Sequence, residues 1–303
     1  MEAFSLIIPS SGREDDLRKV LSSLAFPLMN IREILVVWDG KASPSIEEDF
    51  SSCRYLGPLG GSGPAAARNR GAAAASGEWL LFLDDDVVPC AGAIGIIEQS
   101  VREHPETGAW VFNVSAHPDI ERNIYVKWAY SSRAHAVYPD GAVPVSPSQF
   151  CSSFIAVRRN VFEELNGFNE SLHWFEDVEF AFRAKKRGVP LYSAGSVKGL
   201  HLKQMDREWF VNRCRKLGPG LLTLHSQYSQ AVSRRVAFMM SHPGLCRSAG
   251  LLCLGWRKML PVIERMPGPT GIALLDLAAL AGMTDSLSAA LSEGSESSVT
   301  SRC

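Results

Sequence analysis

The chain has 303 residues, of which 46% are hydrophobic and 21% charged, enough for one large domain and an appendage. Its net charge of −1 conceals a basic segment: residues 198–265 hold twelve Lys and Arg against three Asp and Glu, a net of +9. The seven cysteines are scattered and never form a C-x-x-C pair, which excludes a disulfide framework and a zinc knuckle and favours a reducing compartment.

The N-terminal sequence predicts a strand rather than a targeting segment. Residues 4–8 form an apolar run with no basic region before it, so we expect no signal peptide. No stretch reaches the roughly 18 uninterrupted apolar residues of a membrane-spanning helix. We therefore expect a cytoplasmic protein, which the basic segment could attach peripherally to the inner face of the membrane.

Apolar runs alternate with helical periodicity over the first 200 residues. Leu17, Val20, Leu21 and Leu24 recur at spacings of three and four and predict one buried helix face. We expect strands at 4–8, 34–38, 53–56, 79–83, 108–114, 153–158 and 190–194, and helices at 14–24, 65–75, 159–165 and 178–187. This order predicts an α/β fold with a largely parallel central sheet and helices on both faces.

The sequence becomes helical and basic after about residue 206. We expect helices at 207–216, 221–240 and 251–266, interrupted at Gly218-Pro219-Gly220 and Pro243-Gly244. Residues 292–303 are rich in Ser and Glu, which predicts disorder. The expected organisation is an α/β domain at 1–205, a basic helical extension at 206–291 and a disordered tail at 292–303.

Three aspartates follow a strand that is apolar throughout. Trp79–Leu83 predicts a strand covered on both faces, and Asp84, Asp85 and Asp86 come directly after it. Adjacent carboxylates repel unless a positive group lies among them, and oxygen ligands of this kind suit Mg²⁺ or Mn²⁺. Strand geometry would turn Asp84 and Asp86 to the same side. The alternative is that the aspartates cap the next helix in solvent.

The order of several motifs resembles the family 2 glycosyltransferases of GT-A fold, over roughly residues 4–205. Phe4–Arg13 is similar to the family's opening strand and first donor loop, and Val36–Gly40 to its second strand. Ala67–Gly71 followed by Ser76–Asp86 resembles the region that leads into the D-x-D metal motif, and Trp174–Phe180 the motif with the catalytic base. Trp38 and Lys41 depart from the family pattern beside Asp39.

The resemblance implies inverting transfer of a sugar from a nucleoside-diphosphate sugar, with a UDP-sugar favoured, and dependence on Mn²⁺ or Mg²⁺. Donor binding would take place at about 1–115, and the acceptor side would be formed by about 116–205. The donor-binding residues would be Pro9, Ser10, Arg13, Asp39, Arg68, Asp84 and Asp85. Asp86 and His201 would bind the metal, Trp174 and Glu176 would contact the acceptor, and Asp177 would be the base.

Other interpretations of these motifs stay open. Glu176 and Asp177 could merely charge the first turn of a helix. Gly61–Ala66 mimics a dinucleotide-binding fingerprint, with Asp84 as the ribose ligand. A sugar-phosphate nucleotidyltransferase would use a similar fold and metal, and a catalytically inactive GT-A-like binding module is the non-enzymatic alternative.

The basic segment predicts an anionic partner. Its charge and the apolar clusters Val236–Met240 and Leu251–Leu254 suit a lipid surface or a lipid-linked pyrophosphate acceptor, with a solvated helical surface as the alternative. Nucleic acid is not expected, because only Trp209 and Trp256 interleave with the basic residues. The acceptor could equally be a glycan or a small molecule, and the sequence predicts no oligomeric state.

Overall fold

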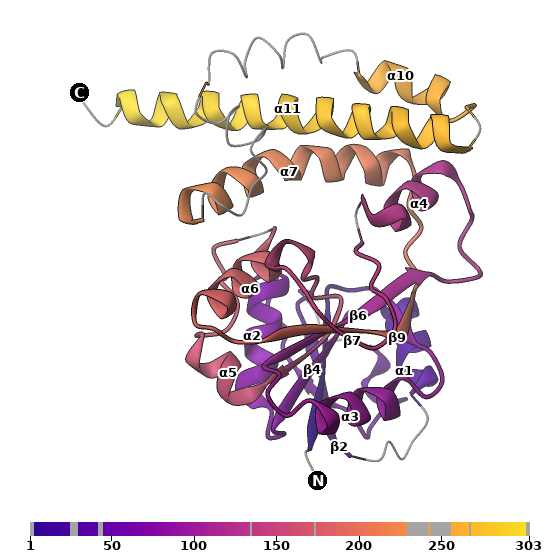
Figure 1. Ribbon diagram of the computed structural model, residues 1–303, viewed down its shortest axis with the longest axis vertical. Helices are drawn as coiled ribbons and strands as arrows, with labels where there is room; N and C mark the ends of the chain where they lie inside the picture. Colours follow the sequence, from indigo (N-terminus) through magenta and orange to yellow (C-terminus); the bar gives the residue numbers. More distant parts are fainter. Residues whose placement is uncertain are drawn as a thin grey trace. The chain divides into compact units, whose positions relative to one another are not determined.

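The chain divides into two compact units, Met1–Ile120 with Tyr130–Lys203 and Glu121–Ala129 with Gln204–Cys303 (Figure 1). The computed structural model describes residues 3–24, 30–41, 45–133, 135–172, 174–228, 242, 256–266 and 268–300, with the backbone alone at 132, 133, 268 and 290–300. The α/β unit thus ends at Lys203. Residues 121–129, which we expected on the acceptor side of that unit, group with the C-terminal helices.

The N-terminal half of the sheet is parallel. Strands β3 (Arg54–Leu56), β2 (Ile31–Trp38), β1 (Phe4–Ser10) and β4 (Trp79–Leu83) lie side by side in that order, each parallel to its neighbour. Such pairs need crossover connections, which the intervening helices provide. This confirms the α/β class and the parallel arrangement expected for the first strands.

The second half of the sheet contains both parallel and antiparallel pairs, whereas we expected a largely parallel sheet. Strand β8 (Phe154–Arg158) lies antiparallel between β4 and β6 (Ala109–Ala116). Strand β9 (Leu191–His201) runs parallel to β6 and is longer than expected. It also pairs antiparallel with two unexpected short strands, β5 (Val87–Pro89) and β7 (Ala142–Pro144).

Helices cover both faces of the sheet, as the alternation predicted. Helices α1 (Glu14–Ser23) and α3 (Ala93–Glu103) lie on one face, and α2 (Pro64–Ala74), α5 (Arg159–Glu164) and α6 (Glu176–Lys186) on the other (Figure 1). Helix α3 was not expected from the sequence, although its Ala93, Ile97 and Val101 form a buried stripe. Each face therefore has its own apolar core.

Strand β4 is the centre of both cores. All five of its residues are fully buried, with Trp79, Leu81 and Leu83 facing one core and Leu80 and Phe82 the other. Burial of each such side chain stabilises the fold by about 1.5–3 kcal/mol. The strand is thus held firmly at the point where Asp84–Asp86 begin.

The helical unit contains α4 (Ile124–Trp128), α7 (Arg207–Gln227), α10 (Trp256–Ile263) and α11 (Gly268–Thr300). Helix α7 lies alongside α11, which α10 and α4 also contact (Figure 1). Helix α7 continues through Gly218-Pro219-Gly220, where we expected a break. Packing overrides the local signal here, because a side chain at Gly218 would overlap the backbone of α11.

Helix α11 differs from two expectations. It continues to Thr300, through most of the segment expected to be disordered, since Ser and Glu are tolerated in a helix that is already nucleated. Its Pro269–Ala289 portion, with a mean hydropathy of 1.4, is also long and apolar enough to cross a membrane by length and composition. The rule of uninterrupted apolar residues missed this portion because Asp276 and Asp285 lie within it.

Part of the apolar surface of α11 is buried by packing within the helical unit. Trp128 Nε1 donates to Asp276 at 2.9 Å, and Leu275, Ala278 and Leu287 are buried. The expected apolar clusters at 236–240 and 251–254 lie outside the described residues.

Gly71 shows how closely α2 packs on the sheet. A Cβ there would overlap Ile7 Cγ2 and lie 3.0 Å from Val37 Cγ2, whereas one at Gly95 in α3 would meet nothing within 4 Å. We predict that Gly71→Ala lowers the free energy of unfolding by about 1–3 kcal/mol through overpacking. The matched Gly95→Ala should raise it by about 0.5–1 kcal/mol through helix propensity. Urea denaturation measures both, and a stabilising Gly71→Ala would contradict the packing described.

Candidate functional site

Strands β1, β2 and β4 bring the predicted donor residues to one edge of the sheet. Because these strands are parallel, their carboxyl ends meet at that edge. Ligands of open α/β sheets bind at such an edge. Pro9 and Ser10 end β1, Asp39 follows β2 and Asp84 follows β4. Ser10 and Asp39 are buried.

The three aspartates are neutralised by different cations. They lie in a turn in which Val87 N donates to Asp84 O at 3.1 Å, so strand alternation does not apply to them. Arg13 forms ion pairs with Asp85 and, at 3.2 Å, with Asp86, while Ser10 Oγ donates to Asp85 at 2.6 Å. Asp84 turns away and accepts from Arg68 at 2.8 Å. Asp85 and Asp86 therefore share a cation that Asp84 does not.

His201 lies beside Asp86 because β5 and β9 pair Val87 with His201. Its Nε2 lies 3.1 Å from Asp86 Oδ1, and its Nδ1 is 2.8 Å from the Tyr130 hydroxyl. The Tyr130 contact orients the ring so that Nε2 faces the carboxylate. Sequence reasoning missed Tyr130, because only the fold brings residues 71 positions apart together.

The electrostatics of Asp85 and Asp86 differ. Burial raises the pKa of Asp85, and the Arg13 charge only partly offsets it. Burial also acts to raise the pKa of Asp86, but hydrogen bonding and charge from His201, with help from Arg13, hold that pKa well below its usual range. Asp86 is therefore a persistent anion at the end of β4.

Arg68 joins the aspartate turn to the start of α6. Its guanidinium is buried and donates to Asp84 at 2.8 Å and to Glu176 at 3.0 Å. Its Nε has no hydrogen-bond partner among the described residues. Two motifs that are about 90 positions apart in the sequence thus meet at one side chain.

The start of α6 holds Glu176 and Asp177. Burial, and then the nearby Asp177 charge, raises the pKa of Glu176 to about 7 despite Arg68. Burial also raises the pKa of Asp177, although Asp177 accepts hydrogen bonds from Ser152 N at 3.0 Å and Val178 N at 2.7 Å. Asp177, in the first turn of α6, is therefore held by two backbone amides and is also a more basic carboxylate than usual.

The residue before this pair is strained. Phe175 has φ of 67°, a left-handed conformation uncommon for an aromatic residue. The preceding Trp174 is half-buried, and its ring lies 6.3 Å from that of Phe175. Strain of this kind persists where the surroundings enforce it, and it is concentrated at functional sites.

Asp39 is engaged by the glycine-rich loop. It accepts from Ser62 N at 2.7 Å and Gly63 N at 2.8 Å, just before α2 begins. A dinucleotide fingerprint would instead direct these amides to a pyrophosphate. The geometry therefore disfavours that interpretation of Gly61–Ala66.

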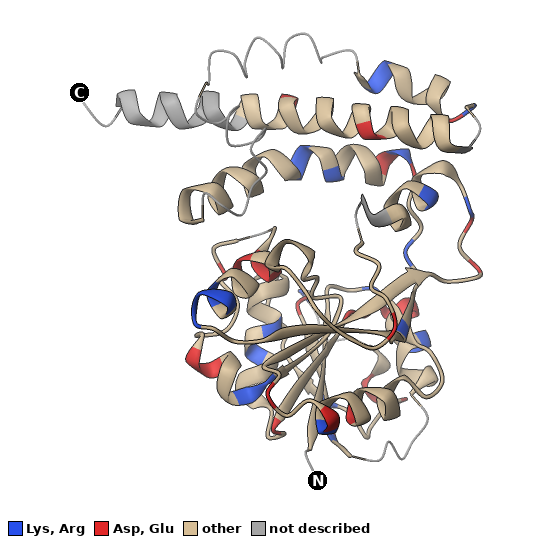
Figure 2. Cartoon of the chain, viewed as in Figure 1, with Lys and Arg blue, Asp and Glu red and all other residues tan. Residues whose placement is uncertain are grey.

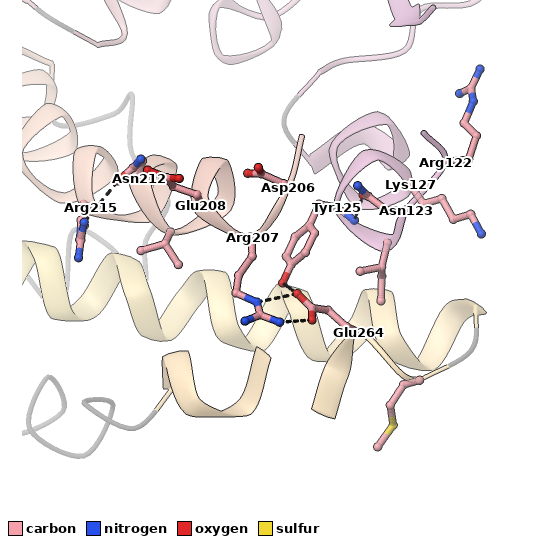
Figure 3. Close-up of a pocket in the computed structure, with 13 residues that line it drawn as sticks. Arg122, Asn123, Tyr125, Lys127, Asp206, Arg207, Glu208, Asn212, Arg215 and Glu264 are labelled. Carbon is pink, nitrogen blue, oxygen red and sulfur yellow. Dashed lines mark hydrogen bonds and ion pairs between the residues drawn. The ribbon is translucent and has the colours of Figure 1, made fainter. Parts of the chain in front are cut away.

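A separate pocket of about 950 Å³ lies in the helical unit and contains none of the residues predicted for donor, metal or acceptor (Figure 3). Arg207 and Tyr125 both contact Glu264 there, with Arg207 Nε at 2.8 Å and the Tyr125 hydroxyl at 2.6 Å. No local sequence pattern indicates this pocket, since its lining comes from α4 and α7, the residues just before them and the residues after α10.

Residues 5–165, more than half of the chain, match the model of glycosyl transferase family 2. The chain belongs to this family. It is 28% identical over 223 residues to a pre-mycofactocin glycosyltransferase of Mycobacterium tuberculosis, covering 69% of this chain and 45% of that protein. An uncharacterized glycosyltransferase of Haemophilus influenzae is 24% identical over 197 residues, covering 59% of this chain and 60% of the other. The chain thus spans about half the length of these curated relatives.

Solved structures show the same fold. The S. aureus TarS 1-349 structure in complex with UDP has a TM-score of 0.55 at 16% identity, over 97% of this chain and 92% of that one. The complex with UDP-GlcNAc gives 0.55 at 15% identity, with the same coverage. The GT-A fold expected from the motifs is confirmed for this family 2 member.

The residues present fit the divalent ion that such a fold often uses. Asp86 Oδ1 and His201 Nε2 are 3.1 Å apart, close to the separation of about 3 Å between adjacent ligands of an octahedral ion bound at about 2.1 Å. Among the described residues no group of three or more His, Cys, Asp and Glu forms a complete metal site. A metal here would therefore take its remaining ligands from phosphate and water.

The Arg68 bridge predicts a pH-dependent stability defect. Removing the cation in Arg68→Met leaves Asp84 and Glu176 unpaired, which should lower the free energy of unfolding by about 3–5 kcal/mol at neutral pH. The folded-state pKa of Glu176 is already raised, and loss of Arg68 raises it further. Stability should therefore fall more steeply in the variant as the pH rises from about 5 to about 8.

Arg70 provides the control, because it is exposed on the same helix. Arg70→Met should change stability by less than about 0.5 kcal/mol. Thermal unfolding across pH measures both variants, and equal, pH-independent effects would show that Arg68 has no electrostatic role.

Proposed function

We propose that this protein is an inverting glycosyltransferase that moves a sugar from a nucleoside-diphosphate sugar to an acceptor hydroxyl in glycoconjugate biosynthesis. The main support for this proposal is the Arg68 bridge, which joins the aspartate turn at the proposed donor site to Glu176 at the start of α6. A UDP-sugar is the favoured donor, in keeping with the nucleotides of the similar S. aureus structures.

The donor would bind at the sheet edge formed by β1, β2 and β4. Pro9, Ser10 and Arg13 come from the end of β1, and Arg13 supplies a half-exposed cation for phosphate oxygens. Asp39 would lie near the nucleobase, and Asp84 and Asp85 near the ribose or the sugar. The unpartnered Arg68 Nε is a further donor for a ligand oxygen.

Asp86 and His201 would hold Mn²⁺ or Mg²⁺. Such an ion, when bound, acts as a Lewis acid on the leaving diphosphate. Asp86 would supply an anionic oxygen ligand, and the Arg13 guanidinium 3.2 Å away favours its ionised form independently of His201. Tyr130 keeps His201 oriented toward it.

Asp177 would take the proton of the acceptor hydroxyl as that oxygen attacks the anomeric carbon. Its raised pKa makes it a better base than an exposed aspartate, and two backbone amides fix its orientation. Direct displacement with one base inverts the anomeric configuration. Trp174 and Glu176 would line the acceptor side.

We also propose a cytoplasmic location with peripheral contact to the inner face of a membrane, on the basis of the +9 balance of residues 198–265. A glycan, a lipid-linked molecule or a small molecule could be the acceptor, and nucleic acid is not a proposed partner. The product distinguishes the two alternatives from this proposal. A glycosyltransferase releases a nucleoside diphosphate and joins a sugar to the acceptor, a nucleotidyltransferase releases pyrophosphate, and an inactive binding module forms no product.

We predict that Asp86→Ala abolishes the metal-dependent part of UDP binding. The change removes the ionised carboxylate beside His201, while Asp119→Ala, at an exposed aspartate, should leave binding intact. Isothermal titration calorimetry with and without Mn²⁺ measures the effect. Undiminished metal-dependent affinity in Asp86→Ala would remove Asp86 from the metal site.

We predict that Asp177→Asn lowers turnover roughly 10²-fold or more and leaves donor affinity nearly unchanged. The Asn amide oxygen can still accept a hydrogen bond from a backbone amide, so thermal unfolding should show a folded protein. Steady-state kinetics with product anomer analysis provides the test. Full turnover in the variant would leave Asp177 with a structural role alone.

A further inference from the structure

Exposed apolar side chains are concentrated in the helical unit. Among the described residues, the exposed large hydrophobic ones are Val137 in the α/β unit and Met259, Val262, Met266, Leu277 and Leu280 in the helical unit. Single exposed hydrophobic residues need no explanation, but a group on neighbouring elements marks an interaction surface.

Helix α10 has two apolar stripes. Trp256, Leu260 and Ile263 are buried and attach the helix to its own unit. Met259 and Val262, with exposed fractions of 54% and 50%, lie three residues apart and point elsewhere, and Met266 (37%) is exposed in the turn after the helix. Packing within the chain uses the first stripe and leaves the second in solvent.

Cations border the exposed stripe, and one of them, Arg257, is paired with Asp285 of α11 at 3.6 Å. Arg257, Lys258 and Arg265 are exposed, and Figure 2 shows the basic residues on α10. The one carboxylate of 256–266 is Glu264, which is half-buried and paired with Arg207. An apolar stripe bordered by cations is the composition of a helix that lies in the interface of an anionic bilayer.

The pocket of the helical unit continues this surface, because Met266 also lines it. Asp206 caps α7 by accepting from Trp209 N, and Glu264 is held by Arg207 and Tyr125. Arg122, Lys127 and Arg215 are further lining cations. Glu208 also lines the pocket, so its four cations, Arg207 included, exceed its three carboxylates by one. In Figure 3 the charged ends of Arg122 and Lys127 point away from the Arg207 and Glu264 pair, and a phosphate-bearing headgroup would contact them on that side.

We propose that the exposed face of 257–266, together with this pocket, is the surface by which the protein docks on an anionic lipid bilayer. This inference rests on the membrane contact proposed above and names its residues. A second copy of the chain is the less suitable occupant, since a symmetric contact would bring the Lys258 and Arg265 side chains of two copies together without a facing carboxylate.

The test is flotation of the whole chain with vesicles of phosphatidylcholine alone or mixed with phosphatidylglycerol. We expect binding only to the anionic vesicles, weakened at physiological salt. Met259→Ser with Val262→Ser, and separately Lys258→Gln with Arg265→Gln, should each lower the partition coefficient roughly tenfold or more. Val137→Ser and the pair Lys185→Gln with Lys186→Gln are matched controls on exposed residues of the α/β unit and should change nothing.

Three results would overturn the proposal. They are no binding to anionic vesicles at low salt, equal binding to neutral vesicles, and binding that the 257–266 variants leave intact. Sedimentation distinguishes the alternative occupant, because loss of self-association in the apolar variant without loss of vesicle binding assigns the stripe to a second copy. UDP binding measured on the same variants should be unchanged, so that failure of the docking surface is separable from failure of the glycosyltransferase function.

Discussion

The structure of the α/β unit depends on one buried cation. Arg68 lies on α2 and holds Asp84 at the end of β4 and Glu176 at the start of α6. A buried guanidinium is costly to desolvate, so it is retained only where its carboxylate partners stay close. Because β4 is fixed by both apolar cores, the bridge fixes the start of α6 relative to the sheet edge. The two sides of the proposed site are thereby preorganised before any ligand arrives.

The features of the fold that depend on local sequence patterns could be predicted from the sequence. The apolar run Trp79–Leu83, the aspartates after it and the stripe in α1 all indicated their structures, because side-chain periodicity follows from backbone geometry. Sequence reasoning could not predict which cation neutralises which aspartate, since Arg13, Arg68 and His201 arrive from distant elements. The contribution of Tyr130 and the continuity of α7 through Pro219 likewise depend on tertiary contacts that no local pattern contains.

The charge asymmetry of the chain follows the division into units. Carboxylates gather at the sheet edge, where cations of the protein compensate them and a donor diphosphate with its metal could be held. The helical unit carries exposed cations beside exposed apolar side chains on α10. In the proposed function, chemistry and attachment are thus served by different parts of the chain.

We propose above all that the sheet edge is a metal-dependent nucleoside-diphosphate site. A thermal-shift series with UDP, GDP and ADP, each with Mn²⁺ or with EDTA, tests it most directly. A ligand at 100 times its dissociation constant stabilises the native state by about 2.7 kcal/mol, which is a measurable shift. We expect UDP to raise the unfolding temperature with Mn²⁺ and to have little effect with EDTA. Equal shifts with and without the metal, or no shift with any nucleotide, would contradict it.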